Sequence, residues 1–107
     1  AWIVVINMFE GYMYILLCAD GTFYTGSTRF LNQRLKEHQD GVGCNYTCQR
    51  LPVRLVYYER FNHVALAYFR EKQIQGWKHD KKVALILGHF DVLKGWSKRN
   101  KGASTLR

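Results

Sequence analysis

The first regular pattern along the chain is a short apolar run at residues 12–18, followed by a turn at 19–21 and a second β-prone run at 22–25. Two such runs around a glycine-containing turn predict a β-hairpin. A three-residue turn would place Tyr14 and Tyr24 on one face as diagonal neighbours. A two-residue turn would place them on opposite faces, because a slip of one residue inverts every side chain. The register of the hairpin therefore decides whether the two tyrosines can act together.

The next segment has the spacing of an amphipathic helix over about 29–38, and Ser27 or Thr28 can cap its N-terminus. Arg34 and His38 are four residues apart, so they share one face of this helix. The sequence therefore predicts that these two polar side chains lie side by side.

The second half of the chain begins with a glycine-rich loop at 40–49 and a third strand at 53–59. Asn62 is then placed to cap a long helix over about 63–77. Glu71 falls in the middle of the apolar stripe of that helix, so we expect its carboxylate to point inward.

Asp80 can cap a further short helix that ends near residue 87. This order of elements predicts an α+β domain with a small, three-stranded, largely antiparallel sheet flanked by helices. We expect the domain to span residues 12–87, with an N-terminal flank at 1–11 and a basic C-terminal extension at 88–107. Met8 would then be the natural start of the protein.

Composition supports a folded domain that binds a polyanion. Of the 107 residues, 48% are hydrophobic and 15% aromatic, which is enough to build a core. The net charge is +8, and residues 78–107 contribute +6 of it. Nucleic acid is favoured over a membrane surface, because no stretch pairs a basic face with a broad apolar face. We expect contacts to the nucleic acid from Lys78, Lys81 and Lys82.

The cysteines indicate a reducing compartment. Cys18, Cys44 and Cys48 are odd in number and no secretory signal precedes them, which fits the cytoplasm better than a disulfide framework. Cys44 and Cys48 could join a histidine at a zinc site, but no second pair of ligands has the required spacing. The apolar start of the chain is too short to span a bilayer.

An inward Glu71 is costly unless its charge is compensated. An ion pair with Arg34 or Arg70 would compensate it, and so would a bound metal ion. The sequence alone leaves both explanations open.

Three segments of the sequence together resemble the GIY-YIG nuclease family. They are YMYILLCADGTFYTGSTRFLNQRLKEH, RLPVRLVYYERF and REKQIQGW. Tyr14 ends the first half of the motif, and Tyr24 begins the second half. Arg34 follows Tyr24 by ten residues, and His38 follows Arg34 by four. Glu71 lies on the later helix. Ser27 stands where some members have a lysine.

The resemblance implies a metal-dependent endonuclease that hydrolyses phosphodiester bonds in DNA, including branched or single-strand-containing DNA. Glu71 would hold one Mg²⁺ or Mn²⁺ ion, and Arg34 would stabilise the phosphate. Tyr14 or Tyr24 would act on the attacking water, and His38 would either orient these groups or only pack in the core. The alternatives are a non-catalytic nucleic-acid-binding module on the same fold and an interaction protein. A protein partner is undefined.

Overall fold

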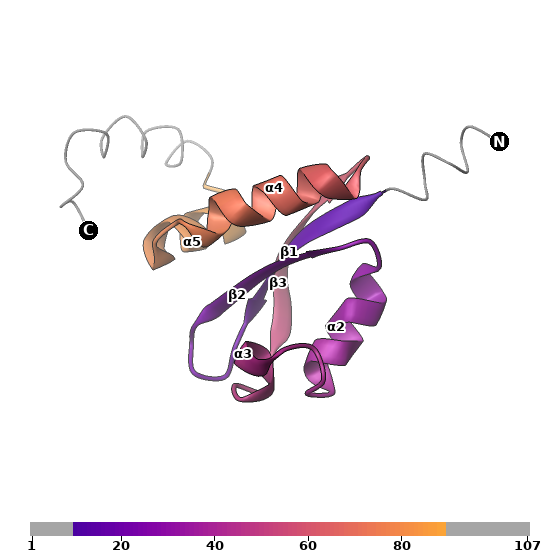
Figure 1. Ribbon diagram of the computed structural model, residues 1–107. Coiled ribbons are helices and arrows are strands. Elements are labelled where there is room, and N and C mark those ends of the chain that lie inside the picture. Colours follow the sequence, from indigo (N-terminus) through magenta and orange to yellow (C-terminus); the bar gives the residue numbers. More distant parts are fainter. Residues whose placement is uncertain (1–9, 90–107) are drawn as a thin grey trace. The chain divides into compact units, whose positions relative to one another are not determined.

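The computed structural model describes residues 10–89. The chain divides into two compact units, residues 1–76 and 77–107. Within its described part, the first unit contains the following elements (Figure 1): β1 (Gly11–Leu17), β2 (Phe23–Thr28), α2 (Leu31–Gln39), α3 (Asn45–Cys48), β3 (Arg54–Phe61) and α4 (Val64–Gln75). The predicted α+β class and three-stranded antiparallel sheet are confirmed. The predicted domain limits stay a prediction.

The sheet has the order β2-β1-β3, and both pairings are antiparallel. In the hairpin the Cys18 N–H donates to the Thr22 carbonyl at 2.9 Å, which closes a three-residue turn. Gly21 ends this turn with φ +84°, a conformation that glycine adopts without strain. Leu16 consequently pairs with Tyr24. Of the two registers that the sequence left open, the structure therefore has the one that places Tyr14 and Tyr24 on one face.

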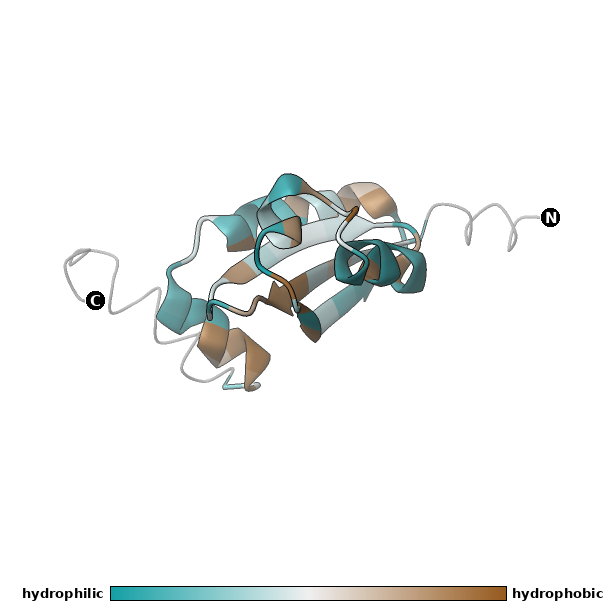
Figure 2. Ribbon diagram, turned by 90° about the horizontal axis from the view of Figure 1, so that it is seen from below, coloured by the Kyte–Doolittle hydropathy of each residue, from teal (hydrophilic) through white to brown (hydrophobic). Residues whose placement is uncertain are grey.

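Helices cover both faces of the sheet, with α4 on one face and α2 and α3 on the other (Figure 1). Tyr14 and Leu16 of β1 form a buried cluster against which Leu31 and Leu35 of α2 pack. These two leucines interrupt an otherwise hydrophilic helix (Figure 2). Met13 and the other alternate residues of β1 belong to the α4 face, because side chains alternate along a strand. Each face of the central strand thus supports its own layer.

The start of α2 differs from the prediction. It begins at Leu31, two residues later than expected, and no side chain caps it. Thr28 accepts a hydrogen bond from the Phe30 N–H at 3.0 Å, outside the helix, and Ser27 belongs to β2. Strand pairing therefore holds both proposed capping residues in extended backbone.

The second half of the unit needs two corrections. The segment expected to be a loop contains α3. His63, not Asn62, caps α4, since its Nδ1 accepts a hydrogen bond from the Ala65 N–H at 3.0 Å.

The second unit contains one helix in its described part, α5 (His79–Ile86). Lys78 occupies the N-cap position and Asp80 lies in the first turn, so the expected cap by Asp80 is wrong. Gly88 follows the helix with φ +76°, a left-handed conformation that is common for a glycine just after a helix. Residues 1–9 and 90–107, which include most of the predicted basic extension, lie outside the described residues. Between residues 10 and 89, no helix is long and apolar enough to cross a membrane.

Candidate active site

Tyr14 reaches the edge of the sheet by passing over a glycine. It lies opposite Gly26 in the β1–β2 ladder and is only 2% exposed. A Cβ atom at position 26 would lie 2.5 Å from the Tyr14 hydroxyl oxygen. The absence of a side chain at Gly26 therefore lets the phenol extend across the edge strand.

His38 of α2 lies against α3, the other helix on this face of the sheet. Its side chain is fully buried, its Nε2 lies 2.8 Å from the Tyr14 hydroxyl, and its Nδ1 lies 2.8 Å from Oγ1 of Thr47. Burial lowers the pKa of His38, and the positive charge of Arg34 lowers it further. The ring is therefore neutral near pH 7 and can accept a proton.

Arg34 lies one helical turn before His38, as the spacing predicted, with 31% of its side chain exposed. It donates to Glu37 and to the Gly43 carbonyl, both at 2.9 Å, and it also interacts with the Tyr14 hydroxyl. The hydrogen bond to Glu37 raises the pKa of Arg34. The guanidinium is thus held in one orientation with part of its surface in solvent.

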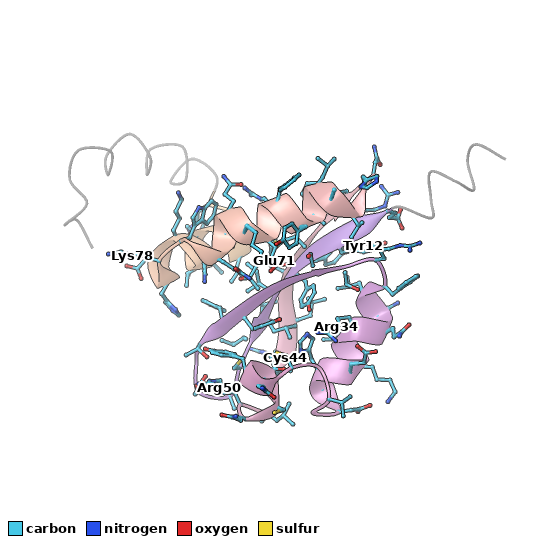
Figure 3. The ribbon with its side chains drawn as sticks, in the orientation of Figure 1. Tyr12, Arg34, Cys44, Arg50, Glu71 and Lys78 are labelled. Atoms are coloured by element: carbon cyan, nitrogen blue, oxygen red, sulfur yellow. The ribbon has the colours of Figure 1, made fainter. Side chains whose placement is uncertain are left out.

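Glu71 extends toward the same edge strand from the other side of the sheet (Figure 3). Its two carboxylate oxygens each accept a hydrogen bond of 2.6 Å, one from Ser27 of β2 and one from Gln75. Lys72 lies 3.4 Å away. Arg34 pairs with Glu37, so the ion pair considered for Glu71 does not form there.

The other arginine considered as a partner, Arg70, pairs with Glu59 at 2.9 Å. Glu71 is instead close enough to Tyr14 to affect it. Burial raises the pKa of Tyr14, Arg34 lowers it, and the Glu71 charge raises it. The candidate site therefore joins the two sheet faces at the β2 edge.

Tyr24 completes the cluster of aromatic rings. Its ring centroid lies 5.2 Å from that of His38 and 6.4 Å from that of Tyr14. Tyr46 of α3 stacks against its ring at 6.0 Å. Burial raises the pKa of Tyr24, and Tyr14 and Cys44 raise it further. Tyr24 therefore remains a neutral phenol.

The structure thus brings Tyr14, Tyr24, Arg34 and His38 into one cluster, with Glu71 beside it. Sequence reasoning missed Ser27 and Thr47 as partners of these residues. Ser27 occupies a family position that is lysine in some members, which was a usable signal. Nothing in the sequence marked Thr47.

The three lysines expected to contact nucleic acid lie in the second unit. Lys78 is exposed, and the Lys81 ammonium lies 4.2 Å from the centre of the Trp77 ring. Lys81 and Lys82 are both half-buried, and burial lowers the pKa of Lys82. Lys78 is thus the most accessible of the three charges.

Side chains that can bind a metal ion do not gather into a group in the part of the chain that the structure describes. Between residues 10 and 89, no three His, Cys, Asp or Glu side chains come together as a ligand group. Cys18, Cys44 and Cys48 are free thiols. Any metal in the candidate site would therefore rest on Glu71 as its protein carboxylate.

Comparisons with known proteins identify the family and the relatives of this chain. Residues 10–84 match the family described as the GIY-YIG catalytic domain. A UPF0213 protein of Natronomonas pharaonis is 44% identical over 77 residues, which cover 72% of this chain and 91% of the relative. A UPF0213 protein of Streptococcus agalactiae is 48% identical over 78 residues, covering 73% and 89%.

A solved structure has a similar fold. The solution NMR structure of a protein from E. faecalis is 34% identical, with a TM-score of 0.51, and the match covers 78% of this chain and 88% of that one. The chain therefore belongs to the GIY-YIG catalytic domain family, whose members are nucleases.

Proposed function

We propose that this protein is a metal-dependent DNA endonuclease that hydrolyses phosphodiester bonds at the edge of β2. The observation that carries the proposal is the position of the Tyr14 hydroxyl. It lies 2.8 Å from a neutral histidine, and the charges of Arg34 and Glu71 both act on it. Phosphodiester hydrolysis needs a base for the attacking water and positive charge for the phosphate. These side chains are of the types that supply both.

Tyr14 is our candidate for the group that activates the water. A neutral phenol is a weak base, so it needs an acceptor for its own proton. His38 Nε2 is placed to take that proton while the phenol oxygen takes one from the water. Tyr24 packs against the ring of His38, and among residues 10–89 the hydroxyl that is bonded to Nε2 is that of Tyr14. We therefore assign Tyr24 to packing and orienting the cluster.

Arg34 is our candidate for binding the scissile phosphate. Glu37 and the Gly43 carbonyl fix two of its terminal N–H groups, and the guanidinium has further donors. A planar fork that is already oriented loses little conformational entropy on binding phosphate. Its charge would stabilise the transition state, in which negative charge increases on the phosphate oxygens.

Glu71 fits a Mg²⁺ or Mn²⁺ ion through its hard oxygen donors. Such ions are commonly held by one or two carboxylates, with water and substrate phosphates as the other ligands. Ser27 and Gln75 orient the carboxylate by their hydrogen bonds. When bound, the metal would supply Lewis-acid stabilisation of the phosphate and leaving oxygen.

The basic residues support a nucleic-acid substrate. Lys78, Lys81 and Lys82 would contact the phosphate backbone without reading sequence, because lysines offer point charges only. The free thiols support the cytoplasm as the compartment. Branched and single-strand-containing DNA are the substrate forms to compare first.

The test is cleavage of labelled duplex, flap, fork and single-stranded DNA with Mg²⁺ or Mn²⁺, with and without EDTA. We expect metal-dependent cleavage that Glu71→Gln abolishes, since the amide keeps the shape but not the charge. DNA affinity and the melting temperature should change little in this variant. Binding without cleavage of any substrate would identify the chain as a non-catalytic module. Wild-type rates from Glu71→Gln would refute the assigned site.

A further inference from the structure

Thr47 makes a buried polar contact that the proposed mechanism does not yet use. Its side chain is fully buried on α3, and its Oγ1 lies 2.8 Å from Nδ1 of His38. The same oxygen lies 3.4 Å from the Cys44 carbonyl oxygen and 3.4 Å from the Cys44 sulfur. A hydroxyl has one proton to donate and can also accept, so its partners restrict the protonation of His38.

Two arrangements of protons are compatible with these distances. In the first, Nδ1–H donates to Thr47, the Thr47 hydroxyl donates to Cys44, and the Tyr14 hydroxyl donates to Nε2. In the second, Thr47 donates to Nδ1, and Nε2–H donates to the Tyr14 oxygen. In the first arrangement, each of these three protons has an acceptor.

The second arrangement fits less well around Tyr14. If Nε2–H donated to the Tyr14 oxygen, the phenol proton would have no acceptor among the hydrogen bonds of residues 10–89, in which His38 is the partner of that hydroxyl. The Thr47 hydroxyl, which donates toward the Cys44 carbonyl at 3.4 Å, would also have to turn away from that carbonyl. A buried hydroxyl without an acceptor costs roughly 1–3 kcal/mol. The first arrangement is therefore favoured, and in it Nε2 is unprotonated.

We propose that Thr47 is a positioning residue that holds His38 in the Nδ1–H tautomer, so that Nε2 can accept the proton of Tyr14. This inference rests on the proposed function, because it explains how His38 is prepared for that reaction. It assigns to α3 a role in the chemistry although no side chain of α3 has to touch the substrate. The tautomer of a histidine is set by the bond that its other nitrogen makes.

The surrounding backbone keeps Thr47 in place. A Cβ at position 43 would overlap the His38 ring, so Gly43 lets the segment pack directly on it. The Gly43 carbonyl also accepts from Arg34, and the Arg50 N–H donates to the Thr47 carbonyl at 3.0 Å. The segment that orients the proposed phosphate ligand thus also orients the proposed base.

The test compares Thr47→Val with Thr47→Ser. Valine keeps the shape and removes the hydroxyl, whereas serine keeps the hydroxyl. The readout is the ¹⁵N spectrum of the His38 imidazole in the protein without DNA, which distinguishes a protonated Nδ1 from a protonated Nε2. We expect the Nδ1–H form in the wild type and in Thr47→Ser, and loss of that preference in Thr47→Val.

Cleavage kinetics supply the second measurement. Thr47→Val should lower kcat by about 10- to 100-fold with little change in KM, the range found when outer partners that orient a histidine are removed. Thr47→Ser should keep most of the rate. A wild-type protein in the Nε2–H form would overturn the proposal, and so would a Thr47→Val variant with wild-type kcat.

The two measurements separate this inference from the proposed function. The tautomer is read without substrate, so the spectrum tests the role of Thr47 even if no DNA is cleaved. Should Thr47→Val fail to fold, the wild-type spectrum and the Thr47→Ser rate still decide the matter. An absence of cleavage with the Nδ1–H tautomer present would refute only the nuclease assignment.

Discussion

Replacing Gly26 by alanine would place a methyl group against the hydroxyl of Tyr14. The added Cβ would lie 2.5 Å from that oxygen and 2.6 Å from the carbon that carries it, whereas ordinary contact begins near 3.4 Å. The phenol would have to move by about 0.9 Å, the difference between these distances. Catalytic groups tolerate displacements of about 0.5 Å. An error near 1 Å costs on the order of 100-fold in rate.

Gly11→Ala is the matched control. A Cβ at Gly11 would lie 2.5 Å from the backbone Cα of Val64, a comparable overlap with residues outside the proposed catalytic set. Both variants should lose about 1–3 kcal/mol of unfolding free energy, because overpacking strains a close-packed interior. Thermal denaturation measures that loss.

The DNA cleavage rate then distinguishes the two variants. We expect kcat to fall about 100-fold in Gly26→Ala and to stay within a few-fold of wild type in Gly11→Ala at temperatures where both are folded. The reasoning is refuted if Gly26→Ala cuts at the wild-type rate, or if Gly11→Ala loses as much activity as Gly26→Ala does.

Four further predictions concern individual groups of the site and the basic surface. Arg34→Ala should lower kcat by about 100-fold or more, and Arg34→Lys should keep only part of the wild-type kcat. A change in KM alone would assign Arg34 to ground-state binding. Tyr14→Phe should lower kcat by about 100-fold or more, and Tyr24→Phe by much less; equal losses would contradict the choice of Tyr14. Because the pKa of His38 lies below its ordinary value of 6.5, the neutral ring persists at pH 6.5. The cleavage rate should therefore decline only at lower pH. The stability that the buried neutral ring contributes should be present above pH 6.5 and be lost as pH falls. A pH series of cleavage rates and melting curves measures both effects. Lys78→Gln should reduce the slope of log K against log salt by about 0.7 to 0.9 in binding titrations, and an unchanged slope would remove Lys78 from the DNA surface.

Local patterns were sufficient to predict the sheet and the spacing of the first helix. The two β-prone runs around the turn predicted the hairpin, whereas the choice between a three-residue and a two-residue turn stayed open until the structure showed Leu16 paired with Tyr24. The spacing of four placed Arg34 and His38 on one face of α2, where both now contact Tyr14. These features depend on near neighbours in the chain, which a sequence displays directly.

The rest depends on contacts between residues distant in sequence. The four residues of α3 are too few to show helical periodicity, and Thr47 becomes important only because His38 packs against it. Likewise, Ser27 was expected to be available for capping, but its bond to Glu71 spans 44 positions. Adjacent Asn62 and His63 are both possible caps, and the local pattern does not distinguish between them.

Glu71 and Tyr14 approach the edge strand from different layers, so the complete set exists only while the strand pairing and both helical layers are formed together. A chain that locally released α4 would keep the Tyr14–His38–Thr47 bonds and lose the carboxylate. Cleavage would then report the fully assembled state, while a probe of His38 would still look native. Comparing the two signals during gentle denaturation would reveal whether the domain opens in parts or all at once.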